Sequence, residues 1–208
     1  MSMPWIRCAA AAIALALAAT GCGAGEKPSA DPEPSTSSSP ATPTETASAA
    51  PTATPQPRST TGATYDILNW DEYADDPALL AWKKALEAGA GSLARGKLLP
   101  GLREYTTPDM FRVYYANVQT GLKEGWQIRP VAHVRAESSR TQGARTTLRL
   151  CLWSPTTSLY LKDGSPVGGG SVKKEWNRQV VRVTAAGGRS RVAEVDFDAG
   201  ICKGVPRP

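Results

Sequence analysis

The chain has 208 residues, 24 Lys and Arg against 19 Asp and Glu, one histidine and four cysteines. This length allows one or two domains, but most of the N-terminal third has too little apolar content for a core, so we expect a single folded domain. Only Cys151, Cys202 and His133 lie in the part of the chain that is expected to fold, fewer than the four Cys or His ligands that a structural zinc site typically takes, and we therefore expect no metal and no cofactor.

The first residues have the layout of a secretory signal peptide. Arg7 supplies a positive charge, and residues 8–19 form an apolar run rich in Ala, Leu and Ile. About a dozen apolar residues fall short of the roughly 20 that cross a bilayer. Residues 1–21 are therefore expected to be removed after export.

The apolar run ends at residues 18–22, Ala-Ala-Thr-Gly-Cys, which resemble the lipobox of bacterial lipoproteins. The resemblance implies that Cys22 carries acyl chains such as palmitate and becomes the first residue of the mature protein. Two acyl chains hold a protein stably, because each buried CH₂ contributes about 0.8 kcal/mol of membrane affinity. The expected location is the outer face of the cell membrane; the alternative is an ordinary secretory signal with an incidental cysteine.

Residues 22–62 read as a disordered stalk. From Pro28 to Thr61, 29 of 34 residues are Pro, Ala, Ser or Thr, and no large aliphatic or aromatic residue occurs before Tyr65. Such a segment cannot offset its own conformational entropy, and its prolines favour an extended chain. This composition predicts that the segment is a spacer, with or without O-linked sugars, in front of a folded domain at residues 63–208.

Cys151 and Cys202 remain in an oxidising compartment after export, and we expect them to form a disulfide. Closing a loop of this length contributes about 4 kcal/mol in the chain-entropy description. The same disulfide would remove the free thiolate that a Cys-His nucleophile, built from Cys151 and His133, would need.

Two helices are predicted first in the domain. Asp76 followed by Pro77 is an N-cap signature, and the helix after it is expected to end at Gly89 to Gly91. Thr107 and Pro108 give the same signature for a second helix, which Gly125 should terminate.

Strands are predicted after Gly125, where the apolar period changes to two. The alternation covers residues 126–135, with Pro130 indicating an edge or a bulge, and residues 146–153, where Cys151 falls on the face opposite the leucines. A short strand at 159–161 and two long ones at 176–185 and 191–197 follow. Helices before an antiparallel sheet predict an α+β fold.

The domain resembles actinobacterial lipoproteins with a nuclear-transport-factor-two-like, cystatin-like fold, which are largely of unknown function. The resemblance runs from Tyr65 to Cys202 and rests on short features: Ala-Trp-Lys-Lys-Ala-Leu at 81–86, the helix after Thr-Pro, the cysteine strand, Lys-Asp-Gly at 162–164 and the last strand. It implies a cone in which a curved antiparallel sheet wraps around the N-terminal helices. The chain lacks a cysteine pair that many such proteins carry near Pro108.

Charge and pattern suggest a surface for anionic partners. The region from Ala63 onward holds 21 basic and 15 acidic residues, a net charge of +6. If the strands align, a basic sheet face would attract anionic polymers or lipid headgroups; a plain solvated face is the alternative. Its candidate residues are Arg129, Arg135, Arg149, Arg178 and Arg182.

These patterns leave two functional hypotheses open. The first is a non-catalytic module that binds an envelope protein or an anionic cell-wall polymer. The second is a small-molecule pocket or an isomerase-like enzyme inside the cone, for which Asp109 and Tyr105 are further candidates. No catalytic residue is assigned, and no nucleic-acid partner is expected outside the cell. The pocket would be lined by Trp82, Phe111, Tyr114, Tyr115 and Trp176.

Overall fold

The structure is a computed structural model that describes residues 54–197 and 199–208. The predicted signal peptide, Cys22 and most of the predicted stalk lie outside these residues. Within the described part of the chain, no helix is both long enough and apolar enough to cross a membrane.

Two long helices form where the capping residues predict them. Helix α1, Pro77–Ala94, begins after Asp76, whose carboxylate accepts hydrogen bonds from the backbone N–H groups of Ala78 and Leu79. Helix α3, Pro108–Glu124, begins after Thr107 and ends at Gly125, whose φ of 72° is the left-handed conformation that glycine adopts without strain. The starts of both helices and the end of the second are thus confirmed.

The predicted end of the first helix is wrong. Helix α1 runs through Gly91 to Ala94. Glycine is needed at this position because Thr61 lies against the helix: a Cβ on Gly91 would come within 2.8 Å of the Thr61 carbonyl oxygen. Gly91 therefore marks a close approach of two segments and not a helix end.

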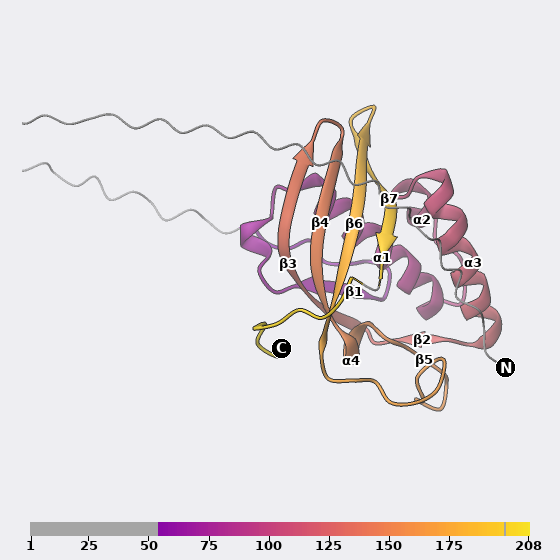
Figure 1. Ribbon diagram of the computed structural model, residues 1–208. Coiled ribbons are helices and arrows are strands. Elements are labelled where there is room, and N and C mark those ends of the chain that lie inside the picture. Colours follow the sequence, from indigo (N-terminus) through magenta and orange to yellow (C-terminus); the bar gives the residue numbers. More distant parts are fainter. Residues whose placement is uncertain (1–53, 198) are drawn as a thin grey trace, which may run out of the picture. The chain divides into compact units, whose positions relative to one another are not determined.

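Five strands form one strongly curled sheet in the order β1-β3-β4-β6-β7 (Figure 1). Their bounds are β1 Thr64–Ile67, β3 Val131–Gln142, β4 Arg145–Trp153, β6 Trp176–Ala186 and β7 Arg189–Asp196. The prediction of an α+β fold is confirmed, but that of an antiparallel sheet is wrong in one respect. Strand β1 pairs in parallel with β3, with Tyr65 beside Ala132, so the sheet is mixed.

The smaller elements lie around this frame. A 3₁₀ helix, η1 (Trp70–Glu72), follows β1, and a single-turn helix, α2 (Gly101–Glu104), links the long helices. Strands β2, Gln127–Ile128, and β5, Leu159–Tyr160, form a separate two-stranded sheet next to α4, Ser154–Thr157. Pro130 separates β2 from β3, so the strand predicted at 126–135 is two strands.

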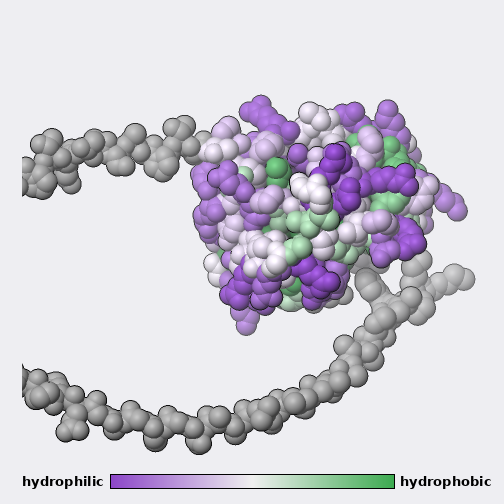
Figure 2. Space-filling view, turned by 90° about the horizontal axis from the view of Figure 1, so that it is seen from above, coloured by the Kyte–Doolittle hydropathy of each residue, from purple (hydrophilic) through white to green (hydrophobic). Residues whose placement is uncertain are grey.

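The main core lies between α1 and the inner face of the sheet. Leu79 and Trp82 of the helix pack with Val134, Leu150 and Val181 of the sheet, and all five are essentially inaccessible. The end of the molecule with the β3–β4 and β6–β7 hairpins is mainly hydrophilic, with small separate apolar patches (Figure 2).

The folded unit begins before the expected boundary at residue 63. The side-chain amide of Gln56 accepts a hydrogen bond from the backbone N–H of Ile67 at 2.9 Å, and the hydroxyl of Thr61 donates to the carbonyl of Glu87 at 2.8 Å. Residues 54–62, which composition assigns to the stalk, are thus attached to the domain.

Candidate functional site

A cavity of about 320 Å³, here called the inner cavity, opens between the two long helices and the sheet. Helices α1 and α3 form one wall, the sheet forms the opposite wall, and the β2–β5 pair and Phe197 lie at the rim. The residues that line it include Tyr65, Leu86, Ala90, Tyr114, Asn117, Val118, Leu152, Ser158, Asn177, Gln179 and Phe197.

The walls of the inner cavity are mainly apolar and buried, whereas its rim is exposed. Ala90 and Val118 of the helical wall are each 5% exposed, and Leu152 of the sheet is 9% exposed. At the rim, Phe197 is 51% exposed. This arrangement of an apolar interior with an accessible rim is typical of small-molecule sites, for which volumes of about 300–1,000 Å³ are usual.

Three polar side chains stand out on the walls. Tyr114 has a buried hydroxyl that finds no hydrogen-bond partner among the described residues. Tyr65 packs edge-on against Trp82, with ring centroids 5.7 Å apart. The Trp82 indole N–H donates to the side-chain oxygen of Gln179 at 3.0 Å, which fixes the orientation of that amide.

Both tyrosines are hydrogen-bond donors at neutral pH. Burial raises the pKa of Tyr65 above its ordinary value, and the nearby Glu87 carboxylate raises it further. Burial, followed by the influence of Tyr65, raises the pKa of Tyr114 in the same direction. Neither phenol ionises near pH 7, so each can offer a proton to an acceptor but cannot act as a base.

The inner cavity lacks the groups that proton abstraction requires. Among the described residues that line it there is no aspartate, glutamate or histidine. Asp109 lies elsewhere, in an exposed ion pair with Arg112. Tyr105 is also away from the cavity and accepts a hydrogen bond from the ammonium group of Lys84 at 3.3 Å.

Of the five residues predicted to line a pocket, the structure places only Tyr114 on the inner cavity. Trp82 is fully buried in the core, one layer beneath the wall. Phe111 lies over another cavity, with the Arg103 guanidinium 5.2 Å from its ring, and Tyr115 is 41% exposed.

Trp176 lies on the other side of the sheet. Its ring packs against Trp153 at 5.4 Å, next to the disulfide that joins Cys151 and Cys202. The alternation of β6 explains the placement, because Trp176 shares a face with Arg178 and not with the buried Gln179.

Sequence reasoning missed the sheet residues that build the cavity, above all Leu152, Asn177 and Gln179. The alternation in β4 did mark Leu152 as inward-facing. The sequence does not mark Gln179 as a cavity residue, because a glutamine in a strand can be either buried or exposed to solvent.

The structure brings four of the five candidate arginines to the outer face of the sheet. Arg135, Arg149, Arg178 and Arg182 alternate with inward-facing residues of β3, β4 and β6. Arg129 lies apart, between β2 and β3, with its guanidinium 4.8 Å from the centre of the Tyr160 ring.

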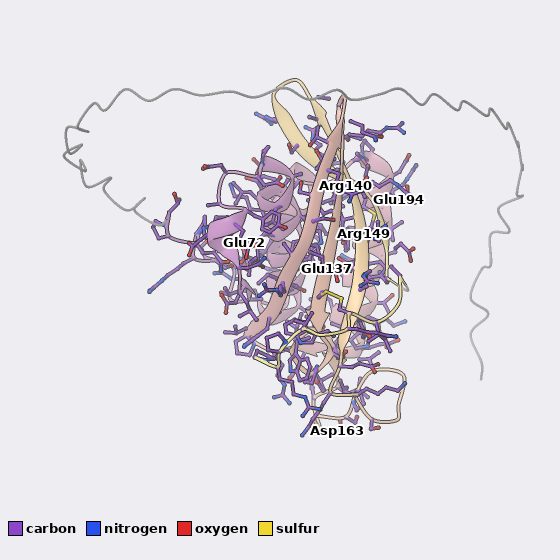
Figure 3. The ribbon with its side chains drawn as sticks, turned by 60° about the vertical axis from the view of Figure 1, so that its left-hand side comes forward. Glu72, Glu137, Arg140, Arg149, Asp163 and Glu194 are labelled. Carbon is purple, nitrogen blue, oxygen red and sulfur yellow. A yellow bond between two sulfur atoms is a disulfide. The ribbon has the colours of Figure 1, made fainter. Side chains whose placement is uncertain are left out.

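Acids offset part of this charge. Arg178 forms two hydrogen bonds with Glu137, at 2.7 and 2.9 Å, and Arg182 pairs with Glu194. Arg135 is 4.0 Å from Glu72. Figure 3 shows Glu137, Arg140 and Arg149 together along β3 and β4, so acidic and basic groups alternate on this face.

Glu137 and the sulfur atoms of Cys151 and Cys202 lie within 4.8 Å of one another. The two sulfurs are joined in a disulfide, which leaves no thiolate to bind a metal. This cluster is therefore not a metal site in the oxidised protein.

Comparison with known proteins adds little. No protein-family model matches the chain, and no curated protein is significantly similar to it. Solved structures that resemble it include a SEC-C motif protein of Rhodopseudomonas palustris, at 15% identity and a TM-score of 0.33 over 61% of this chain and 90% of that one.

Two further structures have comparable scores. A de novo designed protein with a curved β-sheet has 15% identity and a TM-score of 0.29, over 55% of this chain and 96% of its own. AclR, a candidate hydroxylase of Streptomyces galilaeus, has 14% identity and a TM-score of 0.30, over 58% of this chain and 81% of its own. Similarities this weak carry no argument about function.

Proposed function

We propose that the folded unit binds a small, neutral, mainly apolar molecule in the inner cavity, without catalysing a reaction. The observation that carries the proposal is an apolar cavity of about 320 Å³ whose wall residue Tyr114 has a buried hydroxyl without a partner among the described residues. Leaving such a donor unpaired costs about 1–3 kcal/mol. A ligand whose hydrogen-bond acceptor reaches the Tyr114 hydroxyl would recover this cost.

The charge of the walls indicates a neutral ligand. Arg178 is the one charged residue among the described residues that line the inner cavity, and its guanidinium is bound by Glu137 on the opposite side of the sheet. Burying a charged ligand among Leu86, Val118 and Leu152 without a counter-ion would be strongly unfavourable.

The cystatin-like cone and the lipid anchor are part of the same proposal. A curled sheet with α1 on its inner face supports a cone of this kind, in which the inner cavity occupies the open end. Acylation of Cys22 would hold the chain at the outer face of the cell membrane, and the Pro- and Thr-rich stalk would separate the binding unit from the bilayer.

A fluorescence titration with N-phenyl-1-naphthylamine, a neutral apolar probe, tests the pocket. We expect saturable binding at one site per chain, and at least tenfold weaker binding by an Ala90→Phe variant, because the added ring fills the cavity. The matched control is Ala116→Phe, which makes the same change at an exposed position on α3. It should bind within twofold of the unchanged protein.

A second variant separates loss of the pocket from loss of folding. Ser158→Phe narrows the rim at a half-exposed turn, where a larger side chain is tolerated. It should weaken probe binding while leaving the denaturation midpoint near that of the unchanged protein. Absence of saturable binding, or equal binding by all variants, would contradict the proposal.

A second candidate function is recognition of an anionic cell-wall polymer by the outer face of the sheet. The observation that favours it is a group of three exposed arginines, Arg140, Arg145 and Arg149, on the outer face of the sheet. Retention on a dextran sulfate column tests it. Replacing the three arginines with glutamine should lower the eluting salt concentration more than replacing Lys123, Lys162 and Lys174.

A further inference from the structure

Three arginines, two from neighbouring helices and one from the last strand, line one cavity that is separate from the inner cavity. This cavity, here called the arginine cavity, has a volume of about 450 Å³. Its walls are Arg103, Arg112 and Arg191 together with Thr106, Pro108 and Phe111. None of these six residues lines the inner cavity.

The fold brings the three arginines together through an unusual pairing at the sheet edge. Arg103 comes from α2, Arg112 from α3 and Arg191 from β7. The loop between α2 and α3 pairs with β7: the Thr107 N–H donates to the Val192 carbonyl at 2.8 Å, and the Val192 N–H donates to the Tyr105 carbonyl at 2.9 Å. These bonds fix β7 against the start of α3.

Two of the three side chains are already oriented. The Arg103 guanidinium lies 5.2 Å from the centre of the Phe111 ring, a cation–π contact that leaves its N–H groups available at the edges. Arg191 donates through Nε to the backbone carbonyl of Glu104 at 3.3 Å, which leaves its two terminal nitrogens for another acceptor. Preorganised side chains lose less entropy when they bind a ligand.

The third arginine shares its charge with an acid at the surface. Arg112 pairs with Asp109, but both side chains are more than three-quarters exposed, at 77% and 84%. An exposed pair of this kind contributes about 0–1 kcal/mol, so Arg112 can turn to a stronger anion at little cost.

The charge at this cavity matches a phosphate group. Three arginines and Asp109 sum to +2 (3 − 1). A phosphomonoester carries about −1.5 to −2 at pH 7, and the guanidinium fork matches phosphate oxygens in pairs. We propose that the arginine cavity binds the phosphate group of an anionic ligand, with the Phe111 ring contacting the carbon atoms next to it.

Titration calorimetry with the full-length protein in phosphate-free buffer, at constant ionic strength, tests this proposal. Phenyl phosphate is the probe, and benzyl alcohol is the uncharged comparison. We expect binding of phenyl phosphate, none of benzyl alcohol, and at least tenfold weaker binding of phenyl phosphate after Arg103→Gln, Arg112→Gln and Arg191→Gln are combined.

The matched control removes the same charge elsewhere. Arg58→Gln, Arg189→Gln and Arg207→Gln together change three exposed arginines that do not line the cavity. This variant should bind phenyl phosphate within twofold of the unchanged protein. An equal loss in both triple variants would show attraction by net charge alone and would overturn the site.

A single variant and a second ligand complete the test. Arg112→Gln changes a side chain that is 77% exposed, so the fold should stay intact. It should weaken binding about three- to tenfold, as loss of one charge-assisted pair predicts. Unchanged binding would overturn the proposal. Glycerophosphodiester oligomers distinguish the source of the phosphate. If they bind more tightly than phenyl phosphate, the ligand is a polymer or a lipid headgroup. If they bind more weakly, the ligand is a small phosphomonoester, and both outcomes lie within the proposed chemistry.

Discussion

The Tyr114 hydroxyl gives a prediction at the scale of a single atom. An unpaired buried donor costs about 1–3 kcal/mol, and phenylalanine removes it while keeping the ring. Tyr114→Phe should therefore raise the free energy of unfolding of the ligand-free protein by about 1 kcal/mol. Urea denaturation followed by circular dichroism measures the change.

The control for this change lies one residue further along the same helix. Tyr115 is 41% exposed, so its hydroxyl is hydrated and Tyr115→Phe should shift stability by less than about 0.5 kcal/mol. If Tyr114→Phe destabilises the protein instead, the hydroxyl is satisfied in solution and the inner cavity loses its main polar anchor.

A buried ion pair joins α1 to β1 and predicts a larger effect. Lys83 and Glu87 are 1% and 6% exposed, and they bond to each other and to both backbone groups of Tyr65. Lys83→Met leaves Glu87 as an uncompensated buried charge, which costs about 3–5 kcal/mol. Guanidinium denaturation should show this loss.

Adding Glu87→Gln to Lys83→Met should recover much of that stability, because glutamine still accepts the Tyr65 N–H without a buried charge. The neighbouring Lys84→Met change is the control, since Lys84 is only half-buried. A double variant no more stable than the single one would mean that the pair stabilises through its charge and not through its bonds to β1.

At the scale of elements, the disulfide attaches the C-terminal segment to the outer face of the sheet. Cys151 and Cys202 are 51 residues apart, and Trp176 donates through its indole N–H to the Pro206 carbonyl at 3.0 Å. Replacing both cysteines with alanine should cost about 4 kcal/mol by the loop-closure estimate. Thermal denaturation under non-reducing conditions measures it, and a loss below about 1 kcal/mol would contradict the estimate.

The Glu137–Arg178 pair links β3 to β6 and gives stability a pH dependence. The hydrogen bonds from Arg178, with its charge, lower the pKa of Glu137 below the ordinary value in the folded protein. Because this pKa is lower in the folded than in the unfolded protein, the pair contributes to the free energy of unfolding at pH values above the unfolded-state pKa of Glu137. That contribution is lost as the pH falls through the folded-state pKa. Glu137→Gln should therefore destabilise the protein at pH 7.

The difference between the two proteins should narrow as pH falls below the ordinary range of a glutamate. Urea midpoints measured from pH 7 to pH 3 give the comparison. Glu124→Gln, at an exposed position on α3, is the control and should leave the profile unchanged. A gap that stays constant with pH would show that shape and not charge couples the two strands.

The elements also show what the sequence could predict. Local signals were sufficient for the starts of α1 and α3 and for the end of α3, because Asp76, Thr107 and Gly125 act on residues next to them. Strand β1 was missed since its pairing with β3 joins Tyr65 to a partner far along the chain. The same reason hid most of the inner cavity: its lining residues come from eight helices and strands, and Gln179 is recognisable only when Trp82 is known to bond to it.

At the scale of the whole folded unit, the hydrogen bonds of residues 54–62 predict that the domain begins near residue 54. The Trp70 indole N–H donates to the Thr54 carbonyl at 2.9 Å and the Arg95 Nε to the Thr61 carbonyl at 2.8 Å, in addition to the bonds of Gln56 and the Thr61 hydroxyl. Four hydrogen bonds at about 0.5–1.5 kcal/mol each amount to about 2–6 kcal/mol. A fragment of residues 63–208 should be less stable than one of residues 54–208 by this amount in urea denaturation.

Gly91 makes this prediction sharper, because one substitution should have opposite effects in the two fragments. In residues 54–208, Gly91→Ala pushes its Cβ into Thr61 and should destabilise the protein. In residues 63–208, Thr61 is absent, and alanine should stabilise the helix by about 0.5–1 kcal/mol over glycine. A change of the same sign in both fragments would mean that the end of the stalk does not rest on α1, and the domain would then begin at residue 63.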